Sequence, residues 1–75
     1  MTKDEREALY RLFRLHSERD QLKERLGALT GFLANGQPGH VDDAEWDRLG
    51  EQKQAMVAYL NVLDTRIKAA EGRDG

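Results

Sequence analysis

The side chains that could carry out chemistry in this chain are few and isolated. Its two histidines, His16 and His40, lack the HxxxH or ExxH spacing that places two metal ligands on one helix face. Ser17 directly follows His16, and adjacent residues of a helix point in different directions, so the two do not form a nucleophile–base pair. The sequence therefore predicts no catalytic residue, no metal ligand and no enzyme activity.

The glycines in the middle of the chain do not form a phosphate-binding loop either. A P-loop ends in Lys-Ser or Lys-Thr at the start of a helix, and no such pair follows Gly36 and Gly39. The carboxylates are numerous, but they stand where a solvated helix face would place them. We expect no bound cofactor.

Composition narrows the class of protein further. The chain has 75 residues, of which 35% are charged and 39% hydrophobic, with no cysteine and a formal charge of −2. A chain with this charge has no excess of positive charge with which to bind a phosphate backbone, so direct nucleic-acid binding is not expected. No apolar run approaches the length of a membrane span and no signal peptide is recognised, which predicts a cytoplasmic protein that does not enter a membrane.

Turn-forming residues are concentrated at one place and divide the chain into two helices. The segment 35–41 contains the only proline and two glycines, and Asn35-Gly36 suits a left-handed helix end. Thr2 and Glu5 fit a capping box at the start of the first helix. The sequence predicts one domain with a helix over about 3–34, a turn over about 35–41, a helix over about 43–70 and a short tail over 71–75.

The second helix has an equally clear start. Asp42 and Glu45 repeat the capping-box spacing, and Val41 with Trp46 suits a hydrophobic staple across the first turn.

Apolar residues recur in steps of three and four along both predicted helices. This heptad spacing predicts an all-α fold in which two antiparallel helices pack as a coiled-coil hairpin. Arg19 and Lys53 interrupt the pattern, and we expect their aliphatic stems to cover the core while their charges reach water. The predicted hairpin core consists of Leu12, Leu15, Leu22, Leu26, Leu29, Leu33, Trp46, Leu49, Met56, Leu60, Leu63 and Ile67.

The two apolar rows can be aligned across the turn. If the chain folds back at residues 37–39, facing residues have numbers that sum to about 78, so that Leu33 meets Trp46 and Arg19 meets Leu60.

Apolar side chains outside the core predict a binding surface. An exposed apolar stripe usually marks an interaction site. We expect it to close a homodimer as a four-helix bundle, or else to receive another protein. The candidate partner or dimer interface consists of Leu9, Phe13, His16, Val57, Tyr59 and Val62.

The second helix also carries a pattern that coiled-coil geometry does not demand. It follows the order Q-x-x-x-M-x-x-Y-x-x-x-L-x-x-R-I, and the first helix carries a companion run over 18–26 with Leu29 and Phe32-Leu33. Together these resemble the small helical-hairpin proteins of tailed bacteriophages and prophages, often grouped with crAss-phage-related proteins of unknown function. The matching residues of the second helix are Gln52, Met56, Tyr59, Leu63, Arg66 and Ile67.

The resemblance implies a role in infection. A described relative is a phage quorum-sensing anti-activator of Pseudomonas, which binds a LuxR-type transcription factor and a type IV pilus assembly ATPase. By this resemblance the chain would be a phage-encoded inhibitor that blocks a host protein in the bacterial cytoplasm by direct contact. It departs from the pattern in its longer, proline-containing turn and in Arg6, Arg11 and Arg14 of the first helix.

Two other functions remain open at this stage. The chain could form an oligomeric sponge for a signalling nucleotide in anti-defence, with Arg11, Arg14 and Arg66 in a basic pocket between subunits. It could instead be a structural or assembly adaptor within the virion.

Overall fold

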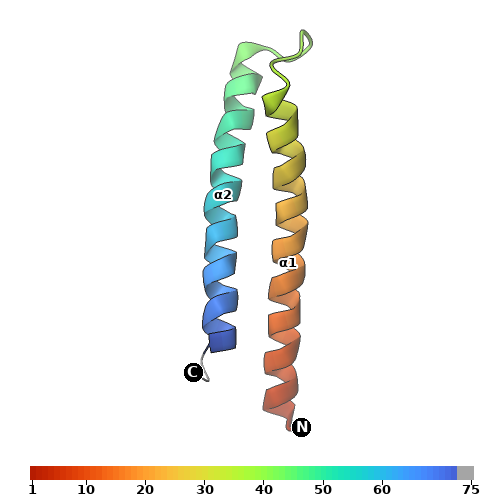
Figure 1. The fold of residues 1–75 in the computed structure, drawn as a ribbon, viewed down its shortest axis with the longest axis vertical. Coiled ribbons are helices and arrows are strands. Elements are labelled where there is room, and N and C mark those ends of the chain that lie inside the picture. The colour runs from red at the N-terminus through yellow and green to blue at the C-terminus, as the bar shows by residue number, and fades with distance from the viewer. Residues whose placement is uncertain (73–75) are drawn as a thin grey trace.

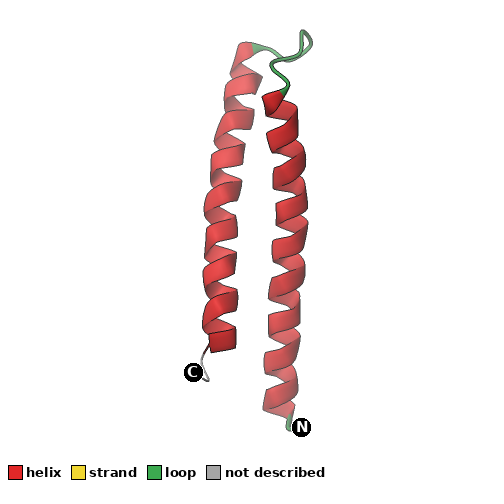
Figure 2. Ribbon diagram, viewed as in Figure 1, coloured by secondary structure: helices red, strands yellow, loops and turns green. Residues whose placement is uncertain are grey.

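The structure, a computed structural model, describes residues 1–72 and contains two long helices joined by one turn (Figure 1). Helix α1 runs over Lys3–Ala34 and helix α2 over Asp43–Gly72. The described residues form helix, turn and loop but no strand (Figure 2). The predicted all-α helical hairpin is confirmed. Glu71 and Gly72 of the predicted tail belong to α2, whereas residues 73–75 lie outside the described residues.

Helix α1 begins with the capping box that the sequence predicts. The backbone N–H of Glu5 donates to the Thr2 hydroxyl at 3.1 Å, and the Thr2 N–H donates to the Glu5 carboxylate at the same distance. Each bond satisfies a backbone or side-chain group that the helix itself leaves unpaired. This reciprocal pair fixes the first turn of α1.

The turn between the helices depends on a glycine and a glutamine. Gly36 has a φ of +87°, a left-handed conformation that side chains with a Cβ rarely adopt, and it ends α1 as predicted. The Gln37 amide then donates to the Val41 carbonyl at 2.8 Å and to the Asp43 carboxylate at 2.9 Å. The glutamine thus ties the loop to the first turn of α2.

The start of α2 differs from the predicted capping box in one half. The Glu45 N–H donates to the Asp42 carboxylate at 2.8 Å, as expected. The Glu45 carboxylate, however, accepts from Arg48 at 2.9 Å instead of reaching back to the cap. An arginine at i+3 competes for this carboxylate because residues three apart share a helix face.

The hairpin core is narrow. Of the residues that the structure describes, only Leu15, Leu22, Leu63 and Ile67 are buried, and among them Leu63 alone is completely inaccessible to solvent. Leu12, Met56 and Leu60 pack against this cluster while staying partly exposed. Two helices can cover only one stripe of each other, so the remaining predicted core residues are half-buried: Leu26, Leu29, Leu33, Trp46 and Leu49.

The predicted register is wrong toward the open end of the hairpin, where the termini lie. Near the turn, Phe32 and Trp46 keep the expected sum of 78, with ring centroids 6.0 Å apart. Farther along, the Arg19–Asp64 and His16–Glu71 pairs sum to 83 and 87. Figure 1 shows that α2 starts farther along the long axis than the end of α1, which agrees with α1 residues contacting later residues of α2 than the sum of 78 predicts.

The hairpin is elongated, and α1 projects beyond α2 at the open end. The chain extends over 57 × 18 × 17 Å, and the N-terminal turns of α1 continue past the last turn of α2 (Figure 1). This segment of α1 therefore has one side that α2 does not cover.

Candidate functional site

A basic hollow lies along the uncovered side of the N-terminal half of α1. Its volume is about 740 Å³, and Arg66 is its single contribution from α2. Arg11, Arg14 and Arg66, which were grouped as a possible basic pocket between subunits, all line this hollow of a single chain. The full lining is Lys3, Arg6, Glu7, Tyr10, Arg11, Arg14, Leu15, Glu18 and Arg66.

Helical spacing explains why these side chains come together. Lys3, Arg6, Tyr10 and Arg14 follow one another in steps of three and four, which places them on one side of α1. Lys3 was not predicted to belong to this basic cluster, and Arg6 was noted only as one of the arginines of the first helix. The same three-and-four spacing from Arg14 backwards would have found both.

The charge of the hollow differs from that of the whole chain. Five cations line it against two carboxylates, Glu7 and Glu18, although the chain as a whole has a formal charge of −2. Within residues 1–72, none of the five cations takes part in an ion pair. The Arg14 guanidinium instead lies 5.9 Å from the centre of the Tyr10 ring, a cation–π arrangement. The hollow therefore brings together positively charged hydrogen-bond donors that can bind an anion.

Two buried core residues anchor the hollow. Leu15 is 6% exposed and contributes to the lining next to Arg14. On α2, Arg66 directly precedes Ile67, which is 4% exposed. Because both residues are held in the hairpin core, the backbones that carry Arg14 and Arg66 are fixed relative to each other.

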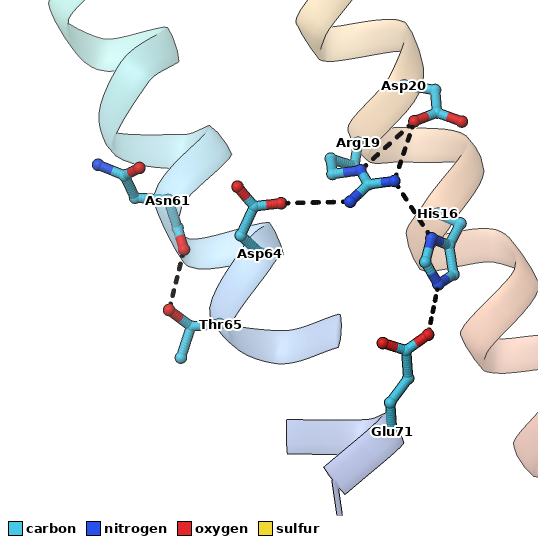
Figure 3. A network of polar contacts seen from close by, with 7 residues as sticks. All are labelled: His16, Arg19, Asp20, Asn61, Asp64, Thr65 and Glu71. Carbon is cyan, nitrogen blue, oxygen red and sulfur yellow. Dashed lines mark hydrogen bonds and ion pairs between the residues drawn. The ribbon is translucent and has the colours of Figure 1, made fainter. Parts of the chain in front are cut away.

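A polar cluster bridges the two helices on a different side of the hairpin from the basic hollow (Figure 3). The Arg19 guanidinium contacts the Asp64 carboxylate of α2 at 3.6 Å and the Asp20 carboxylate at 3.3 Å. His16 Nε2 lies 3.0 Å from Glu71 Oε2 near the end of α2. We call these five residues the polar clasp, because two of its contacts join α1 to α2.

The clasp also fixes the tautomer of His16. An arginine can only donate hydrogen bonds, and the Arg19 guanidinium lies 3.4 Å from His16 Nδ1, so Nδ1 is the acceptor. The hydrogen of a neutral ring is then on Nε2, which donates to Glu71. His16 was predicted to belong to the apolar stripe, and it does lie beside Phe13. Its ring nitrogens, however, contact Arg19 and Glu71, so it also belongs to the clasp.

Arg19 behaves largely as the sequence suggests. Its side chain is 29% exposed, so its stem covers part of the core while its charge reaches carboxylates at the rim. The adjacent Asp20 is one of its partners. The contact with Asp64 was not foreseen, because it depends on the shifted register.

The predicted interface residues do not form one continuous surface. Leu9, Phe13, Val57, Tyr59 and Val62 are all exposed, and Phe13 is the most exposed of them at 69%.

Helical spacing divides these residues between two sides of the hairpin. Val57 is seven residues from Asp64 and therefore shares the side of the polar clasp, as Phe13 does beside His16. Tyr59 and Val62 instead share a stripe with Arg66, on the side of the basic hollow.

Two further classes of site have no support in the described part of the chain. Among residues 1–72, no three histidine or acidic side chains come together as metal ligands. Neither α1 nor α2 is apolar enough over a sufficient length to cross a membrane.

The fold and the hollow define a small helical-hairpin protein with a basic, ligand-sized depression at its open end. Residues 11–69 match the family model Sequestin, and the chain belongs to the Sequestin family. Among curated proteins and among solved structures, nothing matches the chain.

Proposed function

We propose that this chain binds a small anionic molecule in the basic hollow and sequesters it without converting it. The observation that carries the proposal is the set of five cations that line one hollow and make no ion pair within residues 1–72. The family name, Sequestin, is compatible with a protein that withdraws another molecule from solution by binding it.

The chemistry of the lining suggests a phosphorylated ligand with a planar ring, such as a signalling nucleotide. Arginine guanidinium groups can bind phosphate oxygens through two parallel hydrogen bonds, and Arg11, Arg14 and Arg66 supply three such groups. The Tyr10 ring, already beside Arg14, offers an aromatic face for a base. A volume of about 740 Å³ lies within the usual range of small-molecule sites.

The biological setting of the proposal comes from the resemblance to phage hairpin proteins. A phage-encoded sponge would act in the cytoplasm of the infected bacterium and remove a nucleotide that signals defence. Sequestration consumes one binding site per ligand, so a small chain suited to abundant synthesis fits this role. A homodimer is part of the proposal, since two hairpins can combine their uncovered faces into a four-helix bundle.

Calorimetric titration with cyclic and linear nucleotides tests the ligand class. We expect saturable binding of at least one phosphorylated member, and recovery of that ligand unchanged after heat denaturation of the protein. Replacing Arg11 and Arg14 together by alanine should weaken binding at least about tenfold, because each charge-assisted hydrogen bond contributes roughly 1.5–3 kcal/mol.

Arg48→Ala is the matched control. It also removes an arginine, but Arg48 lies near the turn and pairs with Glu45, far along the chain from the hollow. Its effect on binding should be small. If Arg48→Ala weakens binding as much as the double change, or if no phosphorylated compound binds at all, the proposed site is wrong.

A second candidate function is inhibition of a host protein, such as a LuxR-type regulator or a pilus ATPase. The observation that favours it is the exposure of Leu9 and Phe13, at 53% and 69%, beside the polar clasp. Capture of a purified regulator by the wild-type chain but not by Phe13→Asp would support this function. Equal capture by both proteins would count against it. A role as a virion adaptor requires the protein in purified particles.

A further inference from the structure

A second heptad row lies on the outer surface of α2, separate from the hairpin core. Its residues recur in steps of four and three, and every one of them is exposed. Each residue of this outer row directly precedes one of the α2 residues that face α1. Helix α2 therefore has two adjacent rows of heptad-spaced residues, as a helix does when it packs against two other helices. The outer row consists of Ala55, Tyr59, Val62, Arg66 and Ala69.

The hairpin has enough spare surface for another partner. Its accessible surface is 5918 Å², whereas a compact monomer of 8.6 kDa exposes roughly 4,700 Å². The difference, roughly 1,200 Å², exceeds the approximately 800 Å² that each partner buries in a standard interface.

The order of residues in the outer row points to a second copy of this chain as the partner. The row is nearly symmetric about Val62, with an alanine seven residues away on each side. In an antiparallel pair, Val62 therefore meets Val62 of the other copy, and Ala55 meets Ala69. Such a two-fold contact is isologous, because both copies use the same surface. The opposed alanines allow the two helices to approach closely.

Charge selects the antiparallel orientation. A parallel pair would place Arg66 against Arg66, which is repulsive. In the antiparallel pair, Arg66 of each copy faces Tyr59 of the other, where a guanidinium can lie over the aromatic ring. Both side chains are exposed on the isolated hairpin and thus available for this contact.

We propose that two copies of this chain associate through an antiparallel contact of their α2 helices, centred on Val62. The contact gives the homodimer of the proposed function a defined seam and direction, and it does not depend on which ligand is bound. Because Arg66 belongs both to the outer row and to the basic hollow, Tyr59 of one copy lies at the edge of the other copy's hollow. Each hollow is then bordered by both copies.

Single-cysteine variants test this geometry, since the natural chain has no cysteine. Val62→Cys should form a covalent dimer readily under mild oxidation, because the two-fold axis brings residue 62 of both copies together. Ala55→Cys should not, because 14 helical residues separate positions 55 and 69 by about 21 Å along the axis. A disulfide requires Cα atoms within about 7 Å. The double variant Ala55→Cys, Ala69→Cys should cross-link again.

Analytical ultracentrifugation of the unmodified chain provides the second readout. We expect twice the mass of the 8.6 kDa chain at micromolar concentration, a shift to the monomer in Val62→Asp, and no shift in Phe13→Asp. Circular dichroism should show that both variants stay helical. A monomeric wild type, or cross-linking of Ala55→Cys as efficient as that of Val62→Cys, would overturn the proposal. Nucleotide titration is independent of these readouts, so failure of the ligand proposal can be told apart from failure of the seam.

Discussion

At the scale of single residues, the capping box changes the ionisation of one group, the Glu5 carboxylate. The backbone N–H of Thr2 donates to this carboxylate and, with the Thr2 side chain, holds the pKa of Glu5 below its ordinary value. A carboxyl group with a lowered pKa stabilises the folded state above its unfolded pKa. This contribution disappears as the pH falls through the folded pKa.

We therefore predict that the first turn of α1 opens on acidification before the rest of the helix. Amide hydrogen exchange of Thr2, Glu5 and Arg6, whose N–H groups are hydrogen-bonded in this turn, should show protection falling as Glu5 takes up a proton when followed by NMR. Glu5→Gln is the control, because glutamine preserves the capping box but does not titrate in this range. Equal loss of protection in the variant and in the wild type would contradict the prediction.

The basic hollow shows how far single residues can be read from sequence. Arg11, Arg14 and Arg66 were grouped as a possible basic pocket between subunits, and the structure brings all three to one hollow within a single hairpin. His16 keeps its predicted place beside Phe13, but its polar partners Arg19 and Glu71 come from a packing arrangement that composition does not reveal. A residue's spacing predicts the face on which it lies, whereas its hydrogen-bond partners depend on the register of the opposite helix.

At the scale of elements, the glycines of α1 and the turn have opposite roles. A Cβ added at Gly31 meets no atom within 4 Å, and this position is an exposed helix interior. Gly36 has equally open surroundings, but its φ of +87° strains any residue with a Cβ. The same substitution should therefore shift stability in opposite directions at the two positions.

We predict that Gly31→Ala raises the free energy of unfolding by about 1 kcal/mol, because alanine has the higher helix propensity. Gly36→Ala should lower it by about 1–2 kcal/mol, the cost of a left-handed alanine. Urea denaturation at one fixed protein concentration measures both. A shift of the same sign in the two variants would show that the turn does not depend on the left-handed glycine.

The helices themselves were largely predictable, and their relative placement was not. Heptad spacing predicted both elements, and the cap at Thr2 and the stop at Gly36 follow from local chemistry that each segment carries by itself. The register depends on the path of the turn, which Gln37 shapes through bonds to Val41 and Asp43. A glutamine side chain has no positional rule comparable to those for glycine or proline, so this contact left no signal in the sequence.

At the scale of the whole molecule, the hairpin has little core for its length. Four side chains are buried among residues 1–72, and chains of this size seldom obtain enough stability from one small core. Association through the outer row of α2 would bury further apolar surface and add to stability by mass action.

We accordingly predict that the melting temperature rises with protein concentration. Melting curves recorded by circular dichroism over a hundredfold concentration range should shift steadily upward for the wild type. Val62→Asp should melt at a lower temperature that no longer depends on concentration. A constant melting temperature for the wild type would indicate that the hairpin is stable as a single chain.

The distance along the chain between contacts sets the order in which this hairpin can close. The ring pair of Phe32 and Trp46 joins residues on either side of the turn, whereas His16 and Glu71 are 55 residues apart in sequence. Closing a short loop costs less entropy than closing a long one, so the hairpin should zip from the turn toward the termini. The polar clasp then forms last and opens first. The basic hollow lies at the same open end on another side of the hairpin, so the proposed ligand would stabilise the part of the molecule that closes last.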